Sequence, residues 1–201
     1  MLNIGRTRRW IVALSVIVAG GICAGAVIAA QVRGPGTPEG LEAAIDSEPL
    51  VLVADQPARN GLAKRGVFVQ PTSAGFLCLW DAPSASSPAR QGGCNPASDP
   101  FVGGELFVNF VYDGGPAVSD VRDARLSGLV SEAVARAQVL MSDRTRRSLV
   151  LRGASVGAKS YRGFGYRLGR TDLQLGIGPV AVVALDESGA EIDRQTTGFN
   201  G

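Results

Sequence analysis

The sequence predicts a mostly β protein: an N-terminal transmembrane helix, a short linker, and a small β-sandwich-like domain built of hairpins with one short N-terminal helix. One uncharged apolar segment near the N-terminus is long enough to cross a bilayer. Beyond it, apolar runs of four to seven residues are bounded by Pro, Gly, Asn or Asp, which is typical of strands. Gly 27 and Pro 11 make the chain turn-rich without reaching the level of disordered sequences. We therefore expect a cytoplasmic tail at 1–9, an anchor at 10–30, a linker and short helix at 31–48, and an extracytoplasmic β domain at 49–201.

The apolar segment Trp10–Ala30 carries no charge, and as a helix it would be about 31 Å long, which matches the hydrocarbon core of a bilayer. Three arginines precede it, so we expect a single-pass protein of the cell membrane with a cytoplasmic N-terminus. Gly21 and Gly25 fit a small-residue packing motif for a weak homodimer, or are simply small residues of the span. A cleaved signal peptide is the alternative, which would give a secreted form of the same domain.

Cysteine usage agrees with an oxidising compartment. Cys23 lies within the apolar span, so Cys78 and Cys94 are the two cysteines of the domain. One disulfide between them would close a loop of 15 residues, worth about 3 kcal/mol in the chain-entropy model. The loop is rich in Ser, Pro, Gly and Ala and has little to bury, so a covalent link there has a structural purpose.

The domain begins with a helix signal and continues with strand signals. Thr37, Pro38 and Glu39 form a helix start, and a short helix to about Ser47 is expected. Expected strands follow at Leu50–Ala54, Gly66–Gln70, Gly75–Trp80 and Glu105–Val111, with a hairpin loop at Gln70–Gly75 and a turn at Tyr112–Pro116.

The stretch from Leu126 to Met141 carries two periodicities. Its apolar residues recur at helical spacing, but its second half also alternates as a strand does. A similar apolar run and polar arm recurs from Val180, so we predict two hairpins, one from about Ala135, with tips at Ser142–Thr145 and Asp186–Gly189. A helical turn over Gly128–Val134 remains an alternative.

Four segments together resemble a known group of proteins: VFVQPTSAGFLCLWDAP with a following GGC, then GELFVNFVYDGGP, then GLVSEAVARAQVLMSDRTRRSLVL, and finally VAVVALDESGAEIDRQ. The chain resembles uncharacterised membrane-anchored or secreted extracytoplasmic β-rich proteins of high-GC Gram-positive bacteria over most of residues 50–197. The resemblance implies a structural disulfide at the CLW…GGC pair and late β-hairpins of a small sandwich. No activity is attached to the group, so it implies fold and location alone.

One segment, RGASVGAKSY from Arg152, partly matches the phosphate-binding loop G-x-x-x-x-G-K-[ST]. Gly153, Lys159 and Ser160 fit, but Ala158 stands where the second glycine lets backbone amides close around phosphate. Only 41 residues follow Ser160, too few for the remaining units of a nucleotide-binding sheet. We therefore expect a glycine-rich connection between β elements and no nucleotide.

The chain has no histidine, which excludes Ser-His-Asp and Cys-His catalysis and histidine-ligated zinc. A histidine-free hydrolase or transferase of the envelope would need paired carboxylates or a Ser-Lys pair. The sequence offers Asp99 with Glu105, Asp120 with Asp123, and Ser155 with Lys159, none at a recognised spacing. We therefore predict no catalytic residue, metal or cofactor, and keep the enzyme as an alternative whose mark would be two carboxylates roughly 5–10 Å apart in one cleft.

The charges are segregated along the chain. Residues 34–135 carry 6 basic and 12 acidic groups, residues 136–170 carry 9 and 1, and residues 171–201 carry 1 and 5. We name as the basic strip, and as candidate anion-binding residues, Arg144, Arg146, Arg147, Arg152, Lys159, Arg162, Arg167 and Arg170. Alternatively these are outward faces of strands paired with the flanking acidic segments.

The function expected from these features is a membrane-anchored interaction or structural module of the cell envelope that is not an enzyme. Its expected partners are the lipid bilayer through Trp10–Ala30 and, through the basic strip, an anionic envelope polymer or another envelope protein. Nucleic acid is not expected outside the cytoplasm.

Overall fold

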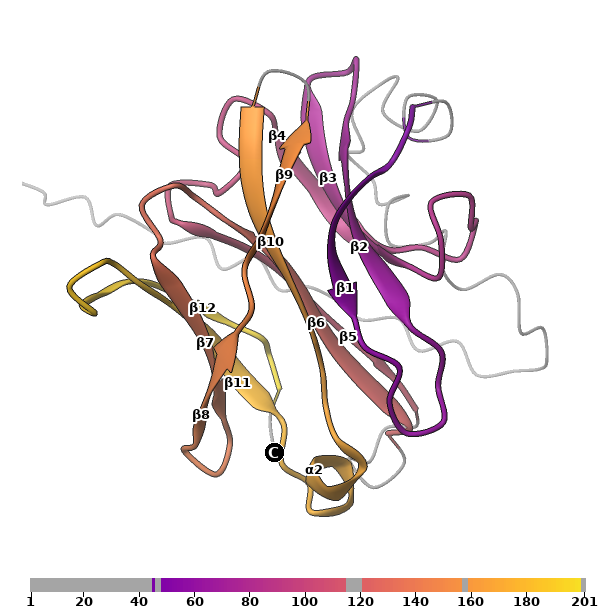
Figure 1. The fold of residues 1–201 in the computed structure, drawn as a ribbon, viewed down its shortest axis with the longest axis vertical. Helices are drawn as coiled ribbons and strands as arrows, with labels where there is room; N and C mark the ends of the chain where they lie inside the picture. The colour runs from indigo at the N-terminus through magenta and orange to yellow at the C-terminus, as the bar shows by residue number, and fades with distance from the viewer. Residues whose placement is uncertain (1–44, 46–47, 115–120, 157–158, 200–201) are drawn as a thin grey trace, which may run out of the picture.

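The computed structural model describes residues 45, 48–114, 121–156 and 159–199, which form three four-stranded antiparallel sheets (Figure 1). The N-terminal sheet contains, in spatial order, β1 (Val51–Gln56), β2 (Arg65–Pro71), β3 (Phe76–Ala82) and β4 (Gln91–Pro96). The central sheet contains β5 (Leu106–Asp113), β6 (Asp123–Val130), β10 (Lys159–Arg167) and β9 (Arg152–Val156). The C-terminal sheet contains β12 (Glu191–Thr196), β11 (Pro179–Leu185), β7 (Arg136–Met141) and β8 (Arg146–Leu149), and a short helix, α2 (Arg170–Gln174), follows β10.

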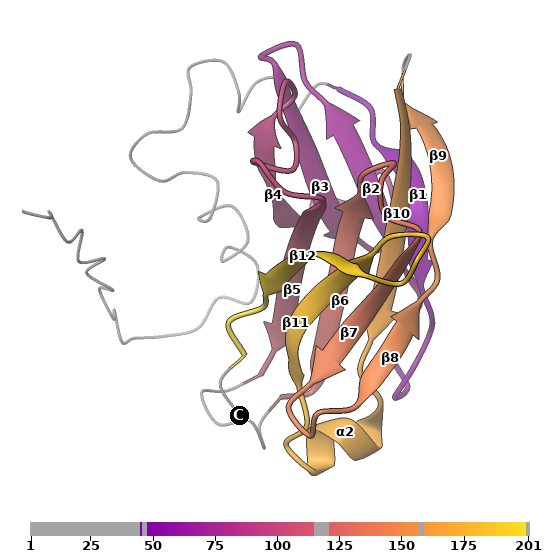
Figure 2. The same cartoon turned by 90° about the vertical axis from the view of Figure 1, so that its left-hand side faces the viewer.

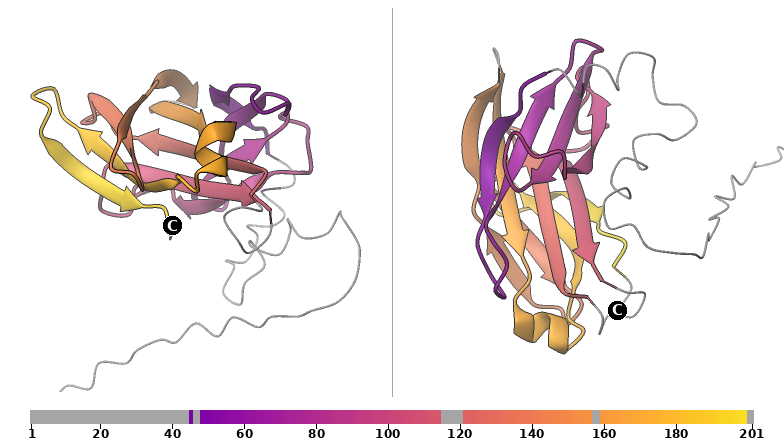
Figure 3. Two further views of the ribbon diagram at one scale, coloured as in Figure 1. Left: turned by 90° about the horizontal axis from the view of Figure 1, so that it is seen from below. Right: turned by 90° about the vertical axis from the view of Figure 1, so that its right-hand side faces the viewer.

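The sheets stack as three layers with the central sheet in the middle (Figures 2 and 3). On β6, Leu126 and Val130 belong to the core shared with the C-terminal sheet, whereas Leu129 belongs to the core shared with the N-terminal sheet. Because side chains alternate between the two faces of a strand, this division places the two outer sheets on opposite faces of β6. All eight residues of β6 are accordingly buried.

The outer face of the N-terminal sheet carries a third apolar cluster around Ile45, Phe68 and Trp80. Buried Gln70 ties the chain to this face: its Nε2 donates to Ile45 O at 3.0 Å, and its Oε1 accepts from Trp80 Nε1 at 2.9 Å. Ile45 itself is helical. The rest of the expected helix from Thr37 and the expected span Trp10–Ala30 lie outside the described residues. Among the residues that are described, no helix is long and apolar enough to cross a bilayer.

The expectation of a mostly β domain built from hairpins is confirmed. The four expected strands correspond to β1, β2, β3 and β5, and both expected tips join strands, Ser142–Thr145 between β7 and β8 and Asp186–Gly189 between β11 and β12. The helical alternative for Gly128–Val134 is wrong, because Gly128 to Val130 complete β6 and Ser131 to Val134 form a turn. The apparent helical spacing arises because β6 is buried on both faces and therefore carries apolar residues on both.

The RGASVGAKSY segment is more than a connection, since it contains β9 and the start of β10, paired antiparallel. Further glycines follow in β10, at positions where the backbone of β1 lies close to it. A Cβ on Gly163 would lie 2.7 Å from Val53 Cγ2, and one on Gly165 would lie 2.7 Å from Asp55 O. Glycine is therefore needed in this strand for packing between sheets, which is why its composition resembles that of a loop.

Candidate functional site

The expected disulfide is present, and it lies within a hairpin. Cys78 on β3 and Cys94 on β4 are directly opposite each other, with their Cα atoms 3.9 Å apart. The bond links the edge strand β4 to the buried strand β3. Cys78 is fully buried against the third apolar cluster, so the bond acts as part of that core.

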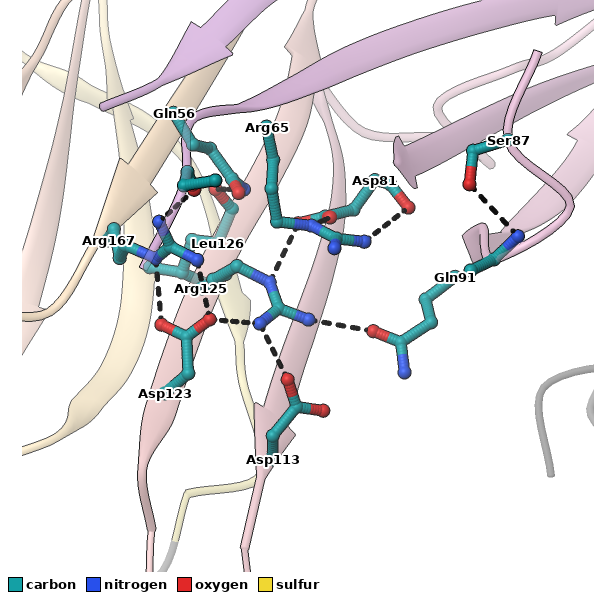
Figure 4. A network of polar contacts seen from close by, with 12 residues as sticks. Gln56, Arg65, Asp81, Ser87, Gln91, Asp113, Asp123, Arg125, Leu126 and Arg167 are labelled. Carbon is teal, nitrogen blue, oxygen red and sulfur yellow. Dashed lines mark hydrogen bonds and ion pairs between the residues drawn. The ribbon is translucent and has the colours of Figure 1, made fainter. Parts of the chain in front are cut away.

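Charged side chains gather at a buried polar network between the N-terminal and central sheets (Figure 4). Its hub is Arg125 on β6, whose side chain is 2 % exposed. Arg125 Nε donates to Asp81 Oδ2 at 3.1 Å, and Nη1 donates to Asp113 Oδ2 at 2.8 Å and also to Asp123. Its remaining nitrogen, Nη2, donates to Gln91 Oε1 at 2.8 Å. One guanidinium thus joins strands from two sheets.

Two further arginines complete the network. Arg167 on β10, opposite Arg125, forms a bidentate pair with Asp123, with contacts of 2.8 and 2.7 Å. Its Nη1 also donates to the carbonyls of Pro57 and Ala63 in the β1–β2 loop, at 3.2 and 2.7 Å. Arg65 on β2 pairs with Asp81. The three arginines and three aspartates, Arg65, Arg125, Arg167, Asp81, Asp113 and Asp123, balance in charge.

Protonation states in the network are fixed by its geometry. Burial acts to raise the pKa of Asp123, but the hydrogen bonds and charges of Arg167 and Arg125 outweigh it and lower that pKa. Burial likewise opposes the charge of Arg125, but the nearby carboxylates of Asp81, Asp113 and Asp123 raise its pKa. Asp123 and Arg125 therefore favour their charged forms in the folded protein.

Three members of the basic strip are used within the fold. Arg167 belongs to the buried network. Arg147 forms a bidentate pair with Asp172 of α2 at 2.7 and 2.8 Å and donates to Tyr166 Oη at 2.8 Å. Arg162 donates to the carbonyls of the turn after β6, Ser131 O at 3.1 Å, Glu132 O at 3.2 Å and Val134 O.

The other five members of the strip are solvent-exposed: Arg144, Arg146, Arg152, Lys159 and Arg170. Arg144 occupies the β7–β8 tip in a left-handed conformation, with φ of 68°, and Arg146 follows on β8. Arg152 and Lys159 lie on β9 and β10 of the central sheet, and Arg170 begins α2. The five exposed residues thus come from the C-terminal sheet, the central sheet and α2.

The described carboxylates that were considered from the sequence as pairs have other hydrogen-bond partners. Asp99 accepts from Gly103 N at 3.2 Å within its own loop, and Glu105 accepts from Ser131 Oγ. Asp120 lies outside the described residues, and Asp123 is bound by two arginines. Within the described ranges, no group of three His, Cys, Asp or Glu side chains is placed to hold a metal ion.

Sequence reasoning missed the network around Arg125. Asp81, Asp113 and Arg125 are spread over 44 residues, and each has the local appearance of an exposed charge at the end of a strand. The one signal in the sequence was a charged residue, Arg125, next to an apolar stretch. Its burial can be recognised only when the register of the strands is known.

Comparison of the chain with protein-family models, with curated proteins and with solved structures finds no match. The function is therefore argued from the geometry of these charged groups.

Proposed function

We propose that the protein is an extracytoplasmic interaction module of the cell envelope, anchored by Trp10–Ala30 with its N-terminus in the cytoplasm, which binds an anionic polymer through exposed basic residues. The observation that carries the proposal is the division of the basic strip. Arg147, Arg162 and Arg167 are saturated by partners inside the fold, whereas five other basic residues extend into solvent.

The contacts of two members of the exposed group are weak. Arg152 lies 4.0 Å from Asp55 with 62 % of its side chain exposed, and Lys159 Nζ donates to a backbone carbonyl, Ala97 O, at 3.3 Å. Exposed contacts of this kind contribute little stability and are readily exchanged for a ligand. Charge of one sign on a surface raises the local concentration of a polyanion and its association rate.

The carboxylate-enzyme alternative receives less support from the geometry. The carboxylates that do gather, Asp81, Asp113 and Asp123, surround one guanidinium, and Asp81 and Asp123 are 0 % and 3 % exposed. A substrate would have to displace Arg125 to reach Asp81 or Asp123, which leaves Asp113 as the one exposed carboxylate of the three.

The test uses the full chain, purified in detergent, and sedimentation with purified envelope fractions. Substituting Gln at all five exposed positions, Arg144, Arg146, Arg152, Lys159 and Arg170, should weaken binding at least roughly tenfold at low salt. The control replaces Lys64 and Arg122, exposed basic residues outside the strip, and should bind as the wild type does. Unchanged binding by the five-residue variant would remove the proposal.

The anchor is tested separately. The intact mass of the protein extracted from membranes should include residues 1–30, whereas a mature form lacking them would show the secreted alternative instead.

A further inference from the structure

The outer face of the C-terminal sheet carries arginines that the basic strip does not include. On β7, Ala137 and Val139 point into the core shared with the central sheet, so Arg136 and Gln138 point away from it. On β8, Leu149 belongs to the same core, and Arg146 lies on the opposite side.

The edge strand β12 follows the same alternation. Asp193 and Gln195 point toward the central sheet, where Asp193 Oδ2 accepts from Glu105 N at 2.7 Å and Gln195 Oε1 accepts from Val108 N at 3.0 Å. Arg194, between them, therefore points to the outer face. We call Arg136, Arg146 and Arg194 the outer arginine face.

Strand register sets the spacing of this face. Arg146 lies opposite Leu140, four residues from Arg136, a separation of about 14 Å along the strands. Gln138 lies between them and accepts from Arg146 Nη1 at 3.4 Å. Arg194 is in register with Gln138 across β11, about 10 Å away. The guanidinium of Arg136 occupies the space beside Gly189, where an added Cβ would lie 2.8 Å from its Nη2.

Most carboxylates around this face are engaged in contacts of their own. Glu191 pairs with Arg194 at 2.8 Å, in an exposed contact. At the two tips, Asp143 accepts from Thr145 N and Oγ1 at 3.0 and 2.6 Å, and Asp186 accepts from Ala190 N and Ser188 Oγ at 2.9 and 2.7 Å. Those two carboxylates are directed into their own turns, and Glu187 adds one exposed charge at the β11–β12 tip.

We infer that the outer arginine face binds a linear polymer that carries phosphodiester groups. The inference rests on the proposed function, names its ligand, and extends its surface from Arg146 to Arg136 and Arg194. Three guanidinium groups spread over about 14 Å exceed the size of one small anion but suit successive charges of a chain. Each is an arginine, whose planar fork binds two phosphate oxygens at once. The chain's two lysines, Lys64 and Lys159, lie outside the C-terminal sheet.

A membrane surface fits this face less well. Docking on a bilayer usually inserts apolar side chains beneath the headgroups. Of the large apolar residues that are exposed in the described part of the chain, Ile192 is the one that lies within a strand of the C-terminal sheet.

The experiment titrates the full chain in detergent with a fluorescent poly(glycerol phosphate) oligomer and follows anisotropy. The face variant carries Arg136→Gln, Arg146→Gln and Arg194→Gln. Its control carries Lys64→Gln and Arg122→Gln, exposed basic residues that belong to neither the face nor the basic strip. The face variant should lose affinity at least roughly tenfold. The slope of its log affinity against log salt concentration should be shallower by about two phosphate contacts, while the affinity of the control stays within about twofold of the wild type.

A second variant separates this inference from the proposed function. Arg136→Gln with Arg194→Gln leaves the basic strip intact and should still lose affinity about fivefold. Normal binding by this double variant, together with loss of binding by a variant that carries Arg152→Gln, Lys159→Gln and Arg170→Gln, overturns the face and keeps the strip. Normal binding by all variants overturns both. Equal affinity for polygalacturonate, or for vesicles containing phosphatidylglycerol, overturns the choice of a phosphodiester polymer.

Glu191→Gln is expected to raise the affinity, a result that misfolding of the variant could not produce. Removing the carboxylate that pairs with Arg194 frees its guanidinium, so affinity for the oligomer should rise about threefold. Unchanged or weaker binding contradicts the inference.

Discussion

At the scale of single residues, Arg125 determines whether the buried polar network is stabilising. It satisfies carboxylates from β3, β5 and β6, and Asp81 and Asp123 have almost no exposure to water. Removing one partner of a buried ion pair leaves an uncompensated charge, which costs far more than the intact pair contributes. The network therefore joins the N-terminal sheet to the central sheet mainly because separating them would leave buried charges without partners.

Replacement of Arg125 by Met should accordingly lower the free energy of unfolding by about 3–5 kcal/mol, because two buried carboxylates lose a partner. Urea denaturation followed by tryptophan fluorescence measures this change, since Trp80 lies in the N-terminal sheet. Arg152→Met, at a side chain that is 62 % exposed, is the control and should change stability by less than about 0.5 kcal/mol. Similar effects of the two substitutions would show that the network is dispensable.

Asp123 gives the network a predictable response to acid. Its pKa in the folded protein is lowered, because Arg167 and Arg125 outweigh the effect of burial. A lowered folded pKa means that the contribution is complete above the ordinary value of 3.8 and is lost as the pH falls through the folded pKa. Asp123→Asn should thus be less stable than the wild type at pH 7 by roughly 3 kcal/mol, and the difference should shrink below about pH 4.

Urea denaturation of both proteins from pH 7 to pH 2 measures the difference. Other acidic groups with lowered pKa, such as Asp172 beside Arg147, titrate equally in both proteins and cancel. Parallel curves down to pH 2 would mean that Asp123 does not gain its stability from the ionised pair.

At the scale of elements, the β3–β4 hairpin depends on its disulfide. Between the two strands, residues 83–90 have little burial, while Cys78 itself is fully buried. Cys78→Ala with Cys94→Ala should lower the free energy of unfolding by about 3 kcal/mol, because the unfolded chain regains the freedom of the closed loop. Adding reductant to the wild type should lower its stability to nearly the same value. A stable double variant with an unchanged denaturation midpoint would contradict this role.

How far each element could be predicted depends on where its partners lie. β1, β2, β3 and β5 are local apolar runs ended by turn residues, and their signals are contained in the sequence itself. β10 has the composition of a loop because Gly163 and Gly165 face β1, a partner roughly a hundred residues earlier. The apolar residues of β6 recur at helical spacing because the strand is covered by a sheet on each face. It can be recognised as a strand only when the packing of the three sheets is known.

The charged residues show the same limit. Composition identified the basic strip, but it could not distinguish Arg167, which is 3 % exposed, from its exposed neighbours. Arg136 and Arg194 escaped notice for the opposite reason, since they join the face of Arg146 only when β7, β8, β11 and β12 are in register. The disulfide could be predicted because the chain beyond the span has two cysteines and one possible pairing.

At the scale of the whole molecule, the close approach of β1 to β10 helps to hold the N-terminal sheet to the central sheet. The two strands belong to different sheets, and the side of β10 that faces β1 carries Gly163 and Gly165. Backbones can come this near only where no Cβ intervenes. The same approach places Gln56 of β1 where its Nε2 donates to Leu126 O at 3.1 Å, so β1 is bonded to the central sheet as well as packed on it.

Gly165→Ala tests this packing with little change in chemistry. The added Cβ would lie 2.7 Å from both Asp55 O and Gln56 Cγ, so β1 must move away from β10. We expect a loss of about 1–3 kcal/mol in the free energy of unfolding, the usual cost of overpacking, measured by urea denaturation. Gly153→Ala on β9 is the matched control, because its Cβ would have nothing within 4 Å, and alanine there should be neutral or slightly stabilising. If both substitutions had the same effect, backbone entropy rather than the contact of β1 with β10 would explain the glycines, and the two sheets would be held together by their shared apolar core and the polar network instead.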